Sequence, residues 1–191
     1  MATKTEHSPK YSLYFCTFTC YKWLKLFEEA NAYMMVYDWF KYLKNKKNVV
    51  VIAFVIMPNH CHLILHLADP LLSLNKLVAN GKRFMAYGII ERLKKASKNN
   101  LLKILRMGVS EVDKSKKQKH RVFEPSFDAK PIYSEKFLEQ KIDYIHQNPV
   151  RGKWNLVDDY SKYQHSSAAF YEMNQSNGYF DIVHYKDLDE I

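Results

Sequence analysis

The chain has 191 residues, of which 47% are hydrophobic and 15% aromatic, which is enough for a sizeable core and excludes a wholly disordered protein. Its five scattered glycines exclude a G-x-G-x-x-G or Walker A phosphate loop, and its three cysteines, without a C-x-x-C pair, argue against a disulfide framework or a Cys-based zinc finger. Residues 1–10 are polar and no apolar stretch approaches the roughly 20 residues of a membrane span, so we expect a soluble, cytoplasmic protein with no membrane partner.

The net charge of +9 is concentrated in one part of the chain. Residues 92–121 contain eleven lysines and arginines against Glu111 and Asp113, whereas the rest of the sequence is neutral. A localised basic stretch is typical of a protein that binds a polyanion such as nucleic acid. Lysines that serve only solubility would give the same pattern, so the charge permits nucleic-acid binding without establishing it.

The first half of the chain predicts a strand, a helix and a β-hairpin. Residues 13–20 are aromatic and β-branched, as in a strand, and residues 28–46 carry apolar side chains at helical spacing. The run VVVIAFVIM at 49–57 is rich in Val and Ile, which indicates a strand that is buried on both faces. A Pro-Asn turn at 58–59 leads into a second strand over 60–67, HCHLILHL.

The middle of the chain predicts a long helix, the basic segment and an edge strand. Residues 71–95 return to helical periodicity. A short helix near 101–107 follows, and we expect a mobile loop after it. Residues 121–133 suggest an edge strand, because Pro125 and Pro131 cannot donate hydrogen bonds within a sheet.

Ser134 marks the start of the last predicted helix, 135–148, because its hydroxyl can accept a hydrogen bond from an early backbone N–H. Pro149 ends this helix, since it disfavours helical geometry in the residue before it. The order β-α-β-β-α-β with a C-terminal helix predicts an α+β protein, a ferredoxin-like two-layer sandwich. We expect a single domain made of a core at about 11–150, a basic insertion at about 96–121 and a C-terminal appendage at about 151–191.

Two histidines at the start of the second hairpin strand form the first candidate site. Because side chains alternate along a strand, His60 and His62 share one face, about 6–7 Å apart at Cα, close enough to bind one metal ion. Cys61 points to the other face, and His66 lies about 13 Å from His62, too far for the same site. Two surface histidines on an open sheet face would show the same spacing, and two histidines alone do not complete a ligand shell.

A tyrosine and an asparagine on the last predicted helix form the second candidate site. Tyr144 and Asn148 are spaced i, i+4, which stacks them on one helix face. The asparagine oxygen would add a neutral ligand to a metal held by His60 and His62, and nitrogen and oxygen ligands of this kind accept Mg²⁺ or Mn²⁺. A half-buried core tyrosine and an asparagine that caps the helix would fit the same spacing.

Three segments together resemble a known family. Residues 55–65, VIMPNHCHLIL, resemble the His-hydrophobe-His motif of the HUH single-tyrosine transposases. Residues 144–151, YIHQNPVR, are similar to the YIxxNPVR segment of the REP-associated tyrosine transposase branch, and residues 163–167, YQHSS, to a later Tyr-x-x-Ser-Ser element. The resemblance covers about residues 11–171 and implies a ferredoxin-like core with the tyrosine on a following helix.

The resemblance implies a metal-dependent endonuclease and transposase that acts on single-stranded DNA near hairpins. His60 and His62 would be metal ligands, with Mg²⁺ or Mn²⁺ as the cofactor. Tyr144 would be the nucleophile that forms a 5′-phosphotyrosine, and Asn148 the third ligand, with Gln147 as the alternative. The candidate side chains for DNA phosphates are Lys82, Arg83, Lys94, Lys95, Arg121 and Arg151.

The chain departs from the family pattern in three places. Cys61 fills a position often held by Val or Met, and residues 152–154 are Gly-Lys-Trp where many members have a small residue followed by glycine. The basic insertion is long, so DNA selectivity does not transfer from relatives. The wider family includes homodimers that share active sites, whereas the REP-associated branch includes monomers, so both states stay open.

Two other functions are compatible with the sequence. A domesticated relative would keep the fold and the basic surface and would bind DNA without cleaving it, although the intact candidate residues argue against decay. A ferredoxin-like RNA-binding module would also suit the charge and the aromatic content. Such a module, however, gives no reason for a His-x-His pair opposite a tyrosine.

Overall fold

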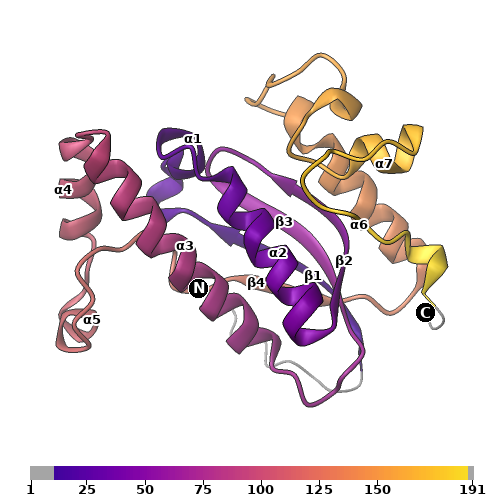
Figure 1. The fold of residues 1–191 in the computed structure, drawn as a ribbon, viewed down its shortest axis with the longest axis horizontal. Helices are drawn as coiled ribbons and strands as arrows, with labels where there is room; N and C mark the ends of the chain where they lie inside the picture. Colours follow the sequence, from indigo (N-terminus) through magenta and orange to yellow (C-terminus); the bar gives the residue numbers. More distant parts are fainter. Residues whose placement is uncertain (1–10, 189–191) are drawn as a thin grey trace.

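A four-stranded antiparallel sheet forms the centre of the computed structural model, which describes residues 11–188. The strands are β1 (Leu13–Thr19), β2 (Val49–Ile56), β3 (His60–Leu67) and β4 (Asp128–Pro131). They lie in the order β2-β3-β1-β4, and each neighbouring pair is antiparallel. With helices between β1 and β2 and between β3 and β4, this topology confirms the predicted α+β, ferredoxin-like fold (Figure 1).

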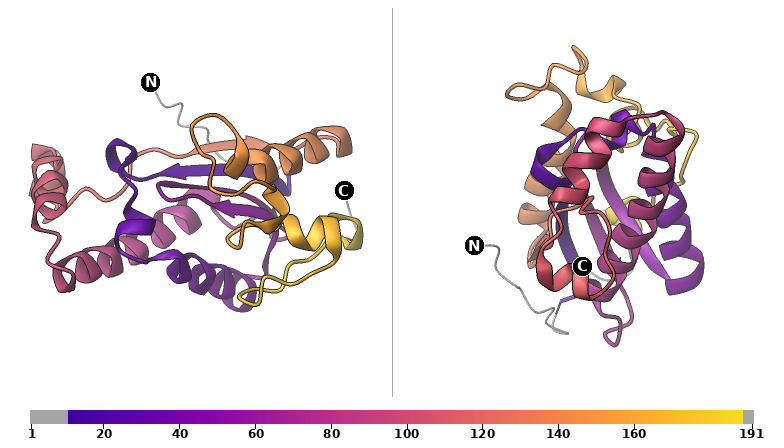
Figure 2. Two further views of the ribbon diagram at one scale, coloured as in Figure 1. Left: turned by 90° about the horizontal axis from the view of Figure 1, so that it is seen from above. Right: turned by 90° about the vertical axis from the view of Figure 1, so that its left-hand side faces the viewer.

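Helices cover both faces of this sheet. The helices are α1 (Leu26–Glu29), α2 (Tyr33–Lys47), α3 (Leu74–Lys95), α4 (Asn99–Met107), α5 (Glu111–Ser115), α6 (Glu135–Gln147) and α7 (Ala168–Met173), and short 3-10 turns occupy Tyr21–Trp23, Asn148–Val150, Tyr160–Lys162 and Tyr185–Asp187. Helices α2 and α3 pack on one face, and α6 forms a further layer on the other (Figure 2). Within residues 11–188, no helix is long and apolar enough to cross a membrane.

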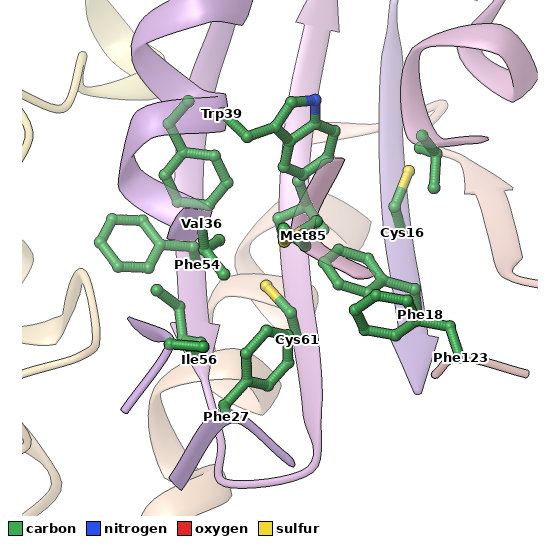
Figure 3. Packing of buried hydrophobic residues seen from close by; sticks show 14 of the residues in the cluster. Cys16, Phe18, Phe27, Val36, Trp39, Phe54, Ile56, Cys61, Met85 and Phe123 are labelled. Atoms are coloured by element: carbon green, nitrogen blue, oxygen red, sulfur yellow. The ribbon is translucent and has the colours of Figure 1, made fainter. Parts of the chain in front are cut away.

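Alternation along the strands buries the sheet on both sides. Phe54 on β2 and Cys61 on β3 face α2, where they lie in one cluster with Val36 (Figure 3). Val55, on the opposite face of β2, packs in the cluster that contains Ile145 of α6. Full burial of a side chain such as Ile145 stabilises the fold by about 1.5–3 kcal/mol. The continuous apolar run of β2 is therefore explained, and its interpretation as a strand buried on both faces is confirmed.

The Tyr-x-x-Ser-Ser element closes the outer edge of β2. Ile56 N donates to His165 O at 2.8 Å, and Ser167 N donates to Phe54 O at 2.9 Å. The Tyr163 hydroxyl donates to Ile56 O at 2.9 Å. Pairing of this kind removes an open strand edge, so the element has a structural role in this chain.

The basic segment projects from one end of the molecule, where α4 and α5 extend away from the sheet (Figures 1 and 2). The prediction of a loop after residue 107 was wrong in part, because α5 forms there. Ser110 caps this helix by accepting a hydrogen bond from Asp113 N at 3.2 Å, and Arg121 Nη2 pairs with Asp113 Oδ2 at 2.8 Å. These contacts tie α5 to Arg121, the last residue of the basic segment.

Candidate active site

His60 and His62 lie next to each other at the start of β3. Their ring centroids are 4.7 Å apart, and the residues are only 3% and 5% exposed. His60 Nδ1 is 2.6 Å from Asn59 Oδ1, and His62 Nδ1 is 2.6 Å from Thr17 Oγ1. Because an amide oxygen only accepts, His60 Nδ1 carries the proton and Nε2 keeps its lone pair. An imidazole oriented in this way is the form that ligates a metal ion.

Burial keeps both imidazoles neutral. It lowers the pKa of His60 to about 4, while contact with Asn148 opposes this effect and the charge of Lys153 adds to it. Burial also lowers the pKa of His62 well below its ordinary range, helped by His60 and Lys141. Both side chains are therefore unprotonated at neutral pH, which is the state that metal binding requires.

Asn148 directs its side-chain oxygen at the first histidine. Its Oδ1 lies 3.4 Å from His60 Nε2, while its Nδ2 donates to the backbone oxygen of Tyr144 at 3.1 Å and so fixes the orientation of the amide. Two acceptors therefore face each other, and a cation between them would satisfy both. His60, His62 and Asn148 fit a divalent ion with nitrogen and oxygen ligands. In the described part of the chain no group of three His, Cys, Asp or Glu residues offers a metal site, so such a site would need the amide.

Tyr144 is placed beside the histidines by α6. Its ring centroid is 5.1 Å from that of His62 and 5.9 Å from that of Phe15, and the residue is 41% exposed. The i, i+4 spacing predicted from the sequence brings both side chains to the histidine pair, with Tyr144 beside His62 and Asn148 beside His60. One chain thus supplies the tyrosine, both histidines and the asparagine.

Lys141 puts a positive charge next to the tyrosine. Its Nζ lies 5.6 Å from the ring centroid of Tyr144 and 5.1 Å from that of Phe15. Burial lowers the pKa of Lys141, and the charge of Lys130 adds to this effect. Lys141 precedes Tyr144 by three residues, so helical spacing alone would have identified it as a neighbour.

Two further residues of the site were missed by the sequence analysis. Thr17 is opposite His62 in the β1–β3 register, which local sequence patterns do not reveal. Asn59 was interpreted only as a turn residue, although it directly precedes His60. By contrast, His146, which shares α6 with Tyr144, is buried and lies 2.8 Å from Ser167 Oγ through its Nε2.

The candidate DNA-contact residues occupy different environments. Lys82 Nζ donates to the backbone oxygens of Glu124, Pro125 and Ser126 at 2.7, 3.3 and 3.3 Å. Arg121 is paired with Asp113 as described above. The other four candidates are exposed to solvent, and they are Arg83, Lys94, Lys95 and Arg151. Lys82 and Arg121 therefore have structural partners within the chain, whereas these four side chains are presented to the outside.

Comparisons with known proteins match part of this chain to a family and its fold to solved structures. A family model described as "Transposase IS200 like" matches residues 9–106, more than half of the chain. The solved structure of a REP-associated tyrosine transposase bound to a REP hairpin aligns over 100% of this chain and 99% of its own, with 17% identity and a TM-score of 0.59, which shows the shared fold. A structure from Deinococcus radiodurans R1, classed as a transposase, aligns over 76% of this chain and 95% of its own, with 17% identity and a TM-score of 0.43.

No curated protein matches the chain. The family model nevertheless covers β1 to α4, including the strand that carries both histidines. It confirms the resemblance found in the sequence motifs. The chain belongs to the IS200-like transposase family.

Proposed function

We propose that this transposase is a metal-dependent, single-tyrosine enzyme that cleaves and rejoins single-stranded DNA at hairpin-bearing element ends. The observation that supports the proposal most strongly is the position of Tyr144, whose ring centroid lies 5.1 Å from that of His62. The side-chain oxygen of Asn148 faces His60 beside it. The REP hairpin named for the structural relative supports a hairpin-bearing DNA substrate. All the groups come from one chain, so the proposed site is complete without a partner subunit.

Tyr144 would be the nucleophile. Its phenolic oxygen forms a bond to the scissile phosphorus, and the bond from phosphorus to the 3′ oxygen breaks. The phenol proton leaves to solvent and the 3′ oxygen takes up a proton, which gives a 5′-phosphotyrosine and a free 3′-OH. Attack by a 3′-OH on this intermediate releases the tyrosine and restores a phosphodiester, so no separate energy source is needed.

His60, His62 and Asn148 would hold a divalent cation, Mg²⁺ or Mn²⁺. Such an ion, when bound, supplies positive charge that stabilises the phosphate as its negative charge develops. Asn59 and Thr17 orient the two imidazoles through their Nδ1 atoms.

Lys141 would stabilise the phenolate form of Tyr144. A cation close to an acidic group favours the ionised state, and the effect is larger where water is partly excluded. The ammonium group lies on the same helix face as the phenol, one turn away. The same charge would attract the scissile phosphate.

The exposed basic side chains would hold the flanking DNA through its phosphates. Arg83, Lys94, Lys95 and Arg151 are exposed to solvent, and the basic segment 92–121 extends the same charge outward. Each phosphate contact would release counterions and steepen the dependence of binding on salt.

A covalent-trapping assay tests the proposal. The protein is incubated with Mg²⁺ or Mn²⁺ and labelled single strands from both flanks of its own gene, and products are separated on denaturing gels. We expect a protein–DNA adduct that EDTA abolishes and Tyr144→Phe removes. Tyr160→Phe is the matched control, because its hydroxyl donates to Glu172 Oε1 at 3.0 Å.

The other outcomes are informative. An adduct that persists in Tyr144→Phe would refute the assigned nucleophile. Tight hairpin binding without any adduct would show a DNA-binding relative that does not cleave. Tighter binding to RNA than to DNA would favour the RNA-binding alternative.

A further inference from the structure

Two tryptophans flank the first histidine of the candidate active site. Trp23 belongs to the 3-10 turn after β1, and its ring centroid is 5.6 Å from that of His60. Trp154 follows the 3-10 turn after α6, and its ring centroid is 6.1 Å from the same imidazole. Trp23 is 58% exposed, whereas the third tryptophan, Trp39, is 6% exposed in the core. Trp23 is thus an exposed indole and Trp154 a partly buried one, which packs against the core on the α6 side of the sheet, and the proposed chemistry uses neither of them.

Trp23 is held in an unfavourable backbone conformation. Lys22 and Trp23 have φ values of 52° and 57°, a left-handed region that bulky residues rarely adopt. Asn59 Nδ2 donates to Trp23 O at 2.9 Å, and Asn59 Oδ1 accepts from His60 Nδ1. One side chain therefore holds both the backbone of the turn that carries the indole and the imidazole of His60. Strain that displays a large apolar side chain beside a reactive site is typical of a functional element.

Positive charge accompanies the two indoles. Lys25 Nζ lies 6.0 Å and Lys153 Nζ 5.7 Å from the ring centroid of Trp154. Lys25 also pairs with Glu28 at 3.5 Å, but both side chains are about half exposed, so this pair is weak. Aromatic faces combined with flexible cations are the usual means of binding single-stranded nucleic acid, because bases stack on the rings and phosphates pair with the charges.

The turn that carries Trp23 is also hydrogen-bonded to the residues that follow the basic segment. Tyr21 N donates to Val122 O at 2.8 Å, and Lys22 N donates to Glu124 Oε1 at 2.9 Å. Residues 122–124 directly follow the basic segment 92–121. Arg121, the last residue of that segment, has its guanidinium carbon 5.7 Å from the ring centroid of Tyr21, so positive charge lies beside the turn that carries Trp23.

We propose that Trp23 and Trp154 form a stacking subsite for an unpaired DNA base beside the scissile phosphate. The proposal rests on the proposed function for the identity of the strand. The subsite accepts any base, because every base presents a π face, and it positions the strand rather than selecting a sequence. The residues at 152–154, which depart from the family pattern, contribute half of it.

Binding of two short probes to the full chain tests the subsite. The probes are labelled dT8 and an eight-unit abasic oligonucleotide, which carries the same phosphates without bases. We expect the protein to bind dT8 tighter by roughly 5- to 150-fold, as expected for one stacked base. Trp23→Ala and Trp154→Ala should each lower this ratio at least about fivefold, and Trp23→Phe should keep most of it. Tyr87→Ala is the control, because this tyrosine is 66% exposed on α3, away from the site.

Each other result has a defined meaning. An unchanged ratio in both tryptophan variants, or equal affinity of the wild type for the two probes, would overturn the subsite. Binding of rU8 much tighter than dT8 would overturn the assignment to DNA. A variant that binds the abasic oligonucleotide as tightly as the wild type does has folded. A retained base preference in a protein that forms no covalent adduct would refute the proposed cleavage and leave the subsite standing.

Discussion

Acid should weaken the fold through His146, the buried histidine that ties α6 to the covered edge of β2. His146 is 2% exposed, and burial lowers its pKa from the ordinary 6.5 to about 4. As the pH falls, the unfolded chain takes up a proton before the folded one. The stability that the fold keeps while His146 is neutral is therefore fully present above pH 6.5, and it is lost as the pH falls towards 4. The difference between these two pKa values corresponds to about 3 kcal/mol, of which about 2 kcal/mol is lost by pH 5.

Urea unfolding at pH 7, 6 and 5, followed by circular dichroism, measures this effect. His146→Gln keeps a polar group near Ser167 but does not titrate, so its free energy of unfolding should fall by about 2 kcal/mol less than that of the wild type between pH 7 and 5. Ser167→Ala is the control. It removes a buried hydrogen bond worth about 1–3 kcal/mol at every pH and keeps the wild-type slope. Parallel loss of stability in His146→Gln and the wild type would refute the reasoning.

Three other variants test the site and the DNA surface. Asn59→Ala removes the acceptor of the adjacent imidazole and should raise the Mn²⁺ concentration for half-maximal adduct formation roughly 10- to 100-fold; an unchanged midpoint would contradict its orienting role. Lys141→Gln should slow adduct formation roughly 10- to 100-fold at saturating DNA, whereas Lys136→Gln, an exposed lysine on the same helix, should not; equal rates would remove Lys141 from the mechanism. For Lys94→Gln combined with Lys95→Gln, we expect the slope of log K for DNA binding against log salt concentration to become less steep by about one to two. An unchanged slope would show that the DNA binds elsewhere.

Elements defined by local periodicity could be predicted from the sequence. The strand over 60–67 was correct at both ends, and the buried strand from residue 49 was correct to within one residue. Strand alternation brought His60 and His62 to one face of the sheet, and helical spacing brought Tyr144 and Asn148 to one face of the helix. These relations depend only on backbone geometry within a single element, which the sequence specifies directly.

Relations between distant segments could not be predicted in this way. Thr17 reaches His62 only because β1 and β3 pair in one register, and a shift by one residue would turn it to the other face. The site also depends on α6 packing on the face opposite α2 and α3, and apolar spacing in α6 does not specify which face it covers. Likewise, Lys82 looked like a surface cation, and its contact with three backbone oxygens follows from the path of residues 124–126.

Asn59 has both a local role in a turn and contacts that link separate parts of the site, and one substitution distinguishes its two side-chain hydrogen bonds. Asparagine is common in turns, so local chemistry accounted for the residue without its two long-range roles. Asn59→Asp keeps an oxygen that accepts from His60 Nδ1 but loses the amide that donates to Trp23 O. Metal-dependent adduct formation should therefore persist, while the preference for dT8 over the abasic probe should fall towards that of Trp23→Ala. Loss of metal dependence with an intact base preference would show that the two roles are assigned to the wrong atoms.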